Sequence, residues 1–369
     1  MSAEITLPVS LGEALDKLTI LEIKLDKIQD VARRQDVQKE HDVLLSSLQS
    51  YVTAFSYHYR ILKEVNLAIW EIQDVFHGKD TSAEQGAQLC REILLENDRR
   101  FRVKAKINAL ANSALREQKG YAKKRALVYT HLGLGDMFWM NGAVRYLATA
   151  YDEVLVVCKT RNEKNATAMY ADDPNIKLLV IQDDAELHPW PVKRHFFADQ
   201  GYTVYSCGFF APRPDKAIYE LPNSFYDDMT IPREVRRNYF HVPRTDAAAA
   251  LAQRFAGIPY IVVHEESSAN KLPIAKNLVA AGEQRLILDL NKNQYESTHT
   301  MFPLAELVVN KPLLDYTALL ESAEELHMIE SSIYCMASHL DLSRVAKRIC
   351  YEPWGGDAER LGVFTTGTV

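Results

Sequence analysis

The sequence predicts an α/β protein in which two small Rossmann-like lobes follow an all-α helical bundle. Residues 11–120 contain no proline and only four glycines, and their apolar residues recur at spacings of three and four, the pattern of amphipathic helices. After residue 122, short apolar runs alternate with helical segments, which indicates a parallel sheet. A chain of 369 residues is long enough for two or three domains, and we expect three, at 1–121, 122–245 and 246–369.

The N-terminal block predicts three long helices. An apolar stripe runs through residues 11–28, and Ser10 with Glu13 has the pattern of a capping box at its start. A second helix is expected from just after Asp36 to about residue 76, and a third from about 82 to 119. Long amphipathic helices with short connections are typical of a helical bundle.

The remainder predicts eight strands in two groups. The apolar runs lie within residues 125–130, 151–159, 177–182, 202–210, 259–264, 283–291, 326–330 and 347–353. Helical patterns at 138–150, 246–256 and 331–340 lie between them. The first four strands belong to one lobe and the last four to the other.

Composition excludes several functional classes. The formal net charge is −6, with 43 Lys and Arg against 49 Asp and Glu, so we expect no nucleic-acid partner, because such a partner needs a concentrated basic surface. No run of about 20 apolar residues that could span a membrane occurs, and residues 1–10 do not have the layout of a signal peptide. The five cysteines form no CxxC pair, which predicts neither a zinc cage nor a disulfide scaffold and favours a reducing cytoplasm.

A glycine turn after the first strand is the most informative segment. Gly133 and Gly135 would allow a tight turn, with backbone N–H groups facing a ligand above the strand. This GxG pattern alone is weak, but Phe138 stands where a dinucleotide fingerprint has its third glycine. The second strand ends in Cys158 and Lys159 where an acid would hold a ribose. The turn therefore argues against a dehydrogenase and against a methyltransferase.

Asp136 and His131 flank this turn. We expect the helix to begin near Asp136 or Met137, so that Asp136 is either an N-cap or a general base for an acceptor hydroxyl. His131 precedes the turn and would line the same cleft.

Polar residues gather after two strands of the second lobe. Open α/β sheets bind ligands outside the carboxyl ends of their strands, and serine hydroxyls, a lysine and helix N–H groups can hold a diphosphate. The alternatives are a solvated loop for the first group and helix capping for the serine pair of the second. The candidates are His264, Glu265, Ser267, Ser268 and Lys271 in the first group, and Glu330, Ser331 and Ser332 in the second.

We expect neither a metal nor a cofactor. No DxD motif stands between strands. The paired acids lie in loops or at helix starts, at Asp172-Asp173, Asp183-Asp184 and Asp227-Asp228. A local cationic patch is expected around Lys271, where the diphosphate would sit.

Three short motifs carry a resemblance to a known family. HLGLGDM, HEESSANK and IESSIYCMA make residues 125–354 resemble a two-lobed GT-B glycosyltransferase of the heptosyltransferase-like group. The resemblance implies that Asp136 is the base, that Ser267, Ser268 and Lys271 contact phosphate, and that residues 330–332 contact the nucleotide diphosphate. This sequence differs from the family in having Glu-Ser-Ser where an Asp-Ser-Gly type is usual. The segments PVSLGEALDKLTILEIKLDKI and LLENDRRFRVKAKIN look like an uncharacterised bacterial helical domain, to which no activity is attached.

The resulting prediction is a metal-independent, inverting glycosyltransferase. It would transfer a sugar from a nucleotide-sugar donor to a glycan or lipid-linked hydroxyl acceptor, in the cytoplasm or at the inner face of the membrane. The first alternative is a non-catalytic nucleotide- or carbohydrate-binding scaffold whose bundle mediates homo-oligomerisation or docking. The second is a methyl or pyruvyl transferase that uses the same cleft.

Overall fold

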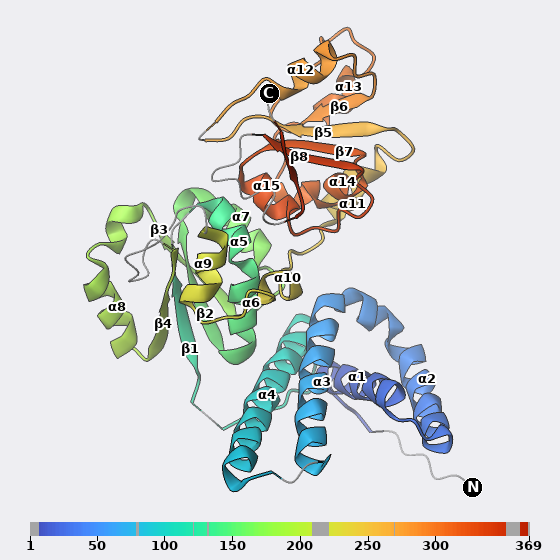
Figure 1. The fold of residues 1–369 in the computed structure, drawn as a ribbon, viewed down its shortest axis with the longest axis vertical. Coiled ribbons are helices and arrows are strands. Elements are labelled where there is room, and N and C mark those ends of the chain that lie inside the picture. Colours follow the sequence, from blue (N-terminus) through green and yellow to red (C-terminus); the bar gives the residue numbers. More distant parts are fainter. Residues whose placement is uncertain are drawn as a thin grey trace. The chain divides into compact units, whose positions relative to one another are not determined.

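The computed structural model describes residues 7–78, 81–120, 122–130, 133–208, 221–268, 270–351 and 362–367. Its contacts group the chain into two compact units. Unit 1 consists of residues 1–126 together with 145–154 and 172–177, and unit 2 consists of residues 127–144, 155–171 and 178–369. Figure 1 colours the elements along the chain.

The N-terminal region is helical, as predicted, but its described residues form four long helices instead of three. They are α1 (Leu11–Lys27), α2 (Val31–Ala54), α3 (Ser56–Gly78) and α4 (Ala83–Leu110). The predicted second helix is two helices, because the backbone leaves the helical conformation at Phe55 (φ −110°, ψ 29°). The predicted third helix starts correctly after its N-cap Ser82 but ends at Leu110, well before residue 119.

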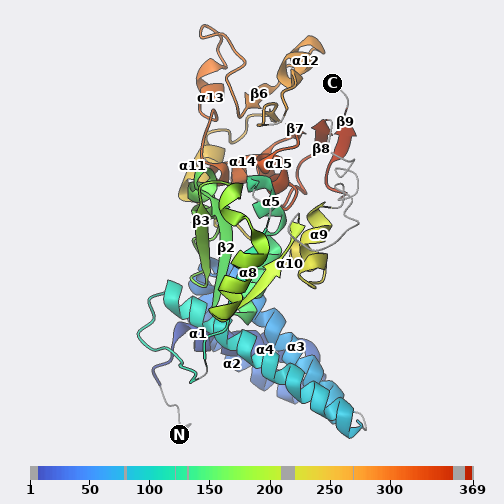
Figure 2. The ribbon, with the colours of Figure 1, turned by 90° about the vertical axis from the view of Figure 1, so that its left-hand side faces the viewer.

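Apolar stripes and one polar cluster hold these helices together. Leu15, Leu18 and Leu62 are fully buried, and α3 and α4 pack along each other (Figures 1 and 2). The carboxylate of Asp16 is 3% exposed and forms a salt bridge with Arg100. Asn66 donates to the same carboxylate at 2.8 Å, so a buried acid in α1 ties α3 and α4 to it.

Helix α4 also binds the two later segments that belong to unit 1. Arg102 pairs with Asp152 (Nε–Oδ1, 2.9 Å), and Lys106 pairs with Asp173 (Nζ–Oδ2, 2.6 Å). Both acids lie outside the N-terminal 121 residues, one in each segment. Charged side chains of α4 therefore find their ion-pair partners in the α/β region.

The first sheet has four strands in the order β3-β2-β1-β4. They are β1 (Arg125–Tyr129), β2 (Glu153–Lys159), β3 (Ile176–Ile181) and β4 (Tyr202–Ser206), all within predicted positions or one residue from them. The predicted helix over 138–150 is two helices that meet at Met140. The helices of this region are α5 (Leu134–Trp139), α6 (Asn141–Ala150), α7 (Glu163–Met169), α8 (Trp190–Asp199), α9 (Leu221–Asp228) and α10 (Val235–Asn238).

The second sheet has five parallel strands in the order β6-β5-β7-β8-β9. They are β5 (Tyr260–His264), β6 (Leu286–Asp289), β7 (Glu325–Ile329), β8 (Lys347–Tyr351) and β9 (Thr365–Gly367). The short edge strand β9 has no counterpart among the predictions. The helices are α11 (Asp246–Gln253), α12 (Ile274–Ala280), α13 (Phe302–Glu306), α14 (Thr317–Ser322) and α15 (Ser332–Ala337).

The predicted class, α/β with parallel strands and an N-terminal helical region, is therefore confirmed. None of the helices in the described ranges has both the length and the apolar character that a bilayer crossing requires.

Candidate functional site

Each sheet has one point where the order of its strands reverses. In the first sheet β2 and β3 lie on one side of β1 while β4 lies on the other; in the second sheet β6 lies on one side of β5 while β7 lies on the other. At such a reversal the connections leave on opposite faces and open a crevice at the strand ends, where open α/β sheets bind ligands. The reversal points are thus the carboxyl ends of β1 with β4, and of β5 with β7.

The glycine turn lies at the first reversal point. Helix α5 begins at Leu134 with Gly133 as its N-cap, two to three residues earlier than predicted, so Asp136 is the third residue of the helix and not its cap. The Gly133 N–H donates to Asp136 Oδ2 at 2.9 Å. A Cβ on Gly133 would stand 2.6 Å from that oxygen, so a larger residue there would displace the folded-back carboxylate. His131 lies outside the described residues.

Gly135 brings the turn against the second group of candidates. A Cβ on Gly135 would stand 3.0 Å from Cys335 Sγ and 3.8 Å from the Cα of Ser332, so the first turns of α5 and α15 are in close contact. Burial raises the pKa of the Cys335 thiol well above its usual value, and the charges of Glu330 and Asp136 raise it further. Residues from both reversal points thus surround one buried thiol.

The serine pair begins α15. Ser331 is the N-cap, and its Oγ accepts from the Tyr334 N–H at 3.2 Å, so its hydroxyl performs the capping role that was one of the two interpretations. Ser332 is the first residue of the helix and lies opposite Gly135.

Glu265 is a buried carboxylate that stabilises the loop after β5. Its side chain is 3% exposed and pairs with Lys292 (Oε1–Nζ, 2.9 Å). Oε2 accepts from the Ala275 N–H at 2.9 Å, and Oε1 accepts from Gln294 at 3.1 Å. These partners occupy both oxygens, so Glu265 fixes the start of α12.

The turn that carries the predicted phosphate contacts is stabilised by its own side chains. Lys271 forms a salt bridge with Glu266, and its hydrogen bond lowers the pKa of Glu266. The Ser267 hydroxyl accepts from the Asn270 N–H at 3.2 Å, while Ser268 is exposed. The expected cationic patch at Lys271 is therefore wrong, since the adjacent Glu266 balances its charge.

The sequence analysis missed two groups at the strand ends. Asp289, the last residue of β6, is 1% exposed, and burial raises the pKa of its carboxyl to about 6. It accepts from the Asn291 N–H at 2.9 Å and from the Gln294 amide. The hydroxyls of Thr130 and Ser206, at the ends of β1 and β4, are buried and have no hydrogen-bond partner among the described residues. A polar residue just after an apolar run was the available signal for Asp289 and Thr130.

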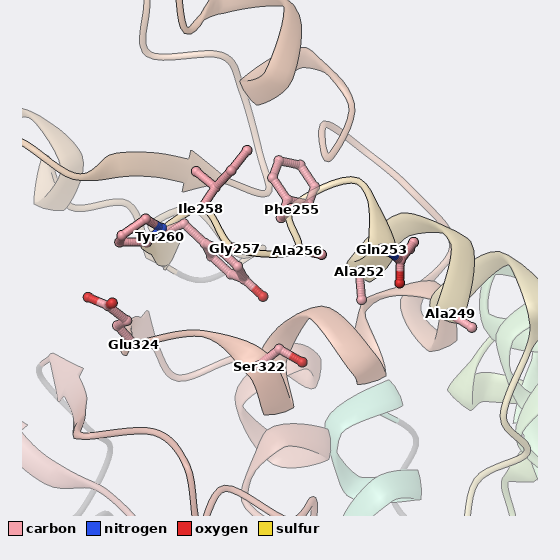
Figure 3. Close-up of a pocket in the computed structure, with 11 residues that line it drawn as sticks. Ala249, Ala252, Gln253, Phe255, Ala256, Gly257, Ile258, Tyr260, Ser322 and Glu324 are labelled. Carbon is pink, nitrogen blue, oxygen red and sulfur yellow. The ribbon is translucent and has the colours of Figure 1, made fainter.

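A pocket of about 470 Å³ lies elsewhere, at the amino end of β5. Figure 3 shows Ser322 and Glu324 on one side of it and the connection from α11 to β5 on the other. It contains none of the predicted site residues. The lining residues are Ala249, Ala252, Gln253, Phe255, Ala256, Gly257, Ile258, Pro259, Tyr260, Ser322 and Glu324.

Comparison with protein families finds one match. Residues 5–129 match a family of unknown function, DUF6165, in agreement with the prediction of an uncharacterised N-terminal domain. The match covers about a third of the chain and includes β1. No curated protein matches the sequence.

Two solved structures show a weak likeness. One is the bacterial iron-containing dodecameric glycosyltransferase TibC from enterotoxigenic E. coli H10407, with 16% identity and a TM-score of 0.40. The other is the dodecameric iron-containing heptosyltransferase TibC in complex with ADP-D-β-D-heptose, with 12% identity and a TM-score of 0.39. In both cases the match covers 70% of this chain and 65% of TibC. At these values the likeness assigns neither family nor activity.

The comparison corrects one prediction. Both TibC structures are described as iron-containing, which contradicts the expectation of chemistry without metal or cofactor, and we withdraw that expectation. Within the described ranges, no three or more His, Cys, Asp or Glu side chains are grouped to hold a metal ion.

Proposed function

We propose that this chain is a glycosyltransferase with a two-lobed GT-B arrangement. It would transfer a sugar from a nucleotide-sugar donor to a hydroxyl of a glycan or lipid-linked acceptor. The supporting observation is the contact of Gly135 with Ser332 and Cys335. This contact joins α5, which follows the first reversal point, to α15, which follows the second. A donor and an acceptor bound there could therefore reach both helices.

In this proposal Asp136 is the base. Its carboxylate removes the proton from the acceptor hydroxyl while that oxygen attacks the anomeric carbon of the donor. The bond from the anomeric carbon to the diphosphate oxygen breaks, and its electron pair leaves with the diphosphate. A single displacement of this kind inverts the anomeric configuration.

The donor would lie against the second reversal point. Ser267, Ser268 and Lys271 would hold the leaving diphosphate together with residues 330–332. The salt bridge between Lys271 and Glu266 is no obstacle, because its partners are 61% and 46% exposed and pairs this exposed to water contribute little to stability. A phosphate oxygen can therefore replace Glu266 as the partner of Lys271.

Asp136→Asn tests the base directly. The asparagine Oδ1 can still accept from the Gly133 N–H, so the turn is kept while the base is lost. After thermal-shift screening of nucleotide sugars has identified a donor, we expect the variant to bind it as the wild type does and to lose at least about 100-fold in turnover. Full turnover in Asp136→Asn would show that the side chain only accepts the hydrogen bond from the Gly133 N–H. A wild-type protein that binds no nucleotide sugar would refute the proposed function.

One observation favours the scaffold alternative as a second candidate. Helix α2 buries only Leu48 of its 24 residues, while Val31 and Val43 are 70% and 66% exposed. Exposed apolar side chains such as these offer contacts to which another chain could pack. In this case the wild type would bind nucleotides without transfer, and Val43→Ser would lower the oligomeric mass measured by light scattering.

A further inference from the structure

His264 has an unusual position at the second reversal point. It is the last residue of β5 and pairs in register with Met328 of β7, the strand on the other side of the reversal. Its side chain is on the opposite face of the sheet from Val263, because successive residues of a strand alternate. Only 7% of the residue is exposed.

The two ring nitrogens of His264 do not both have a hydrogen-bond partner among the described residues. The Asn291 side chain lies within hydrogen-bonding reach of it, and burial lowers the pKa of His264 to about 4, so the imidazole is neutral at pH 7. Its Nδ1 is buried and has no partner within the described ranges. A buried polar atom without a partner costs stability, and such atoms in native proteins call for an explanation.

The first sheet shows the same feature at its own reversal point. The hydroxyls of Thr130 and Ser206 are also buried and have no partner in the described part of the chain. The hydrogen bond from the Cys207 N–H to the Tyr129 carbonyl (3.0 Å) joins the two strand ends that carry them. Within the described ranges, three of the four strand ends at the reversal points thus keep an unpaired buried polar atom, at the positions where open α/β sheets bind ligands. This coincidence points to ligand contacts.

We propose that His264 Nδ1 is the hydrogen-bond partner of a ribose hydroxyl of the nucleotide-sugar donor. The inference rests on the proposed function and adds a contact to it. A neutral imidazole has one donor and one acceptor nitrogen, and a hydroxyl pairs with either because it both donates and accepts. A phosphate oxygen only accepts and gains more from a cation, so the hydroxyls of the nucleoside are the better match.

Two substitutions separate this role from a structural one. In asparagine the amide atoms are attached to Cγ, as Nδ1 is in histidine, so His264→Asn keeps a polar atom at the Nδ1 position. Glutamine carries its amide one bond further and reproduces Nε2, so His264→Gln keeps the outer nitrogen position and loses Nδ1. Binding of ADP, GDP, UDP and CDP to the full chain is measured by calorimetry, and 2′-deoxy and 3′-deoxy forms of the best ligand follow.

We expect His264→Gln to weaken binding of the best ribonucleotide about tenfold and His264→Asn to weaken it less than about threefold. The wild type should bind one of the deoxy forms about tenfold more weakly than the corresponding ribonucleotide. His264→Gln should bind that deoxy form and the ribonucleotide equally tightly. Equal affinities in the wild type and His264→Gln would overturn the role of His264 and leave the proposed function intact. The role of His264 would also be overturned if His264→Gln bound both deoxy forms more weakly than the wild type does, by the same factor as for the ribonucleotide. A wild type that binds none of the four nucleotides would overturn both proposals.

Discussion

Lys106 and Asp173 form an ion pair that water scarcely reaches, and removing the lysine charge should destabilise unit 1 strongly. The two side chains are 3% and 1% exposed, and Nζ lies 2.6 Å from Oδ2. Burial lowers the pKa of Lys106 despite its partner, which shows how much desolvation opposes the charge. Lys106→Met keeps the length of the side chain and leaves Asp173 buried without its cation. A buried pair broken in this way costs about 3–5 kcal/mol.

The assay is thermal unfolding followed by helical circular dichroism. A loss of about 4 kcal/mol corresponds to a drop in Tm of roughly 10 °C for a unit of this size. The matched control is Lys39→Met, since Lys39 and Asp36 form a pair that is 77% and 80% exposed; we expect it to change Tm by no more than about 2 °C. Asp173→Asn added to Lys106→Met removes the unpaired charge and should recover most of the loss. The reasoning is refuted if Lys106→Met behaves like Lys39→Met, or if the double variant is less stable than both single variants.

Two further predictions concern the strand ends. The carboxyl of Asp289 has a pKa of about 6 in the folded chain against 3.8 ordinarily, so its contribution to stability is present below about pH 4 and lost as the pH rises to about 6. The loss is about 3 kcal/mol. Asp289→Asn should flatten this part of the curve of unfolding free energy against pH, and an unchanged slope between pH 4 and 6 would contradict the assignment. Gly133→Ala places a Cβ 2.6 Å from Asp136 Oδ2 and should displace that carboxylate, so we expect turnover to fall as in Asp136→Asn. Gly78→Ala, whose Cβ would meet nothing within 4 Å, is the control, and equal turnover in both would count against the folded-back carboxylate.

Local patterns predicted the elements well, and the errors have a common cause. Residues 36–76 and 138–150 read as single helices because the apolar spacing continues through Phe55 and Met140. Each break is a single residue whose dihedrals differ from those of a regular helix, Phe55 at φ −110°, ψ 29° and Met140 at φ −90°, ψ 0°, and an apolar pattern does not record such a difference. The C-terminal end of the third helix was overestimated for a similar reason, since its last expected turns after Leu110 contain ordinary helix-forming residues.

The candidate site was predicted in type but not in detail. Placing Gly133, Asp136, Ser331 and Ser332 after strands followed from the sequence alone, because each stands directly behind an apolar run. The partners of the charged candidates did not follow. Glu265 is engaged by Lys292 and Lys271 by Glu266, and only the folded loop brings these groups within bonding distance.

The sequence by itself determined the class of this protein: a proline-free helical region, then alternating strands and helices with polar residues behind selected strands. These are properties of periodicity and local backbone preference, which act over a few residues. Tertiary structure alone decided the strand order, and with it the two reversal points and the meeting of Gly135 with Ser332. It also decided that the Asp172-Asp173 pair, which the sequence places only in a loop or at a helix start, neutralises Arg145 and Lys106. The physical reason is that strand pairing and charge burial join residues far apart in the chain, and no local pattern records which partner each will find.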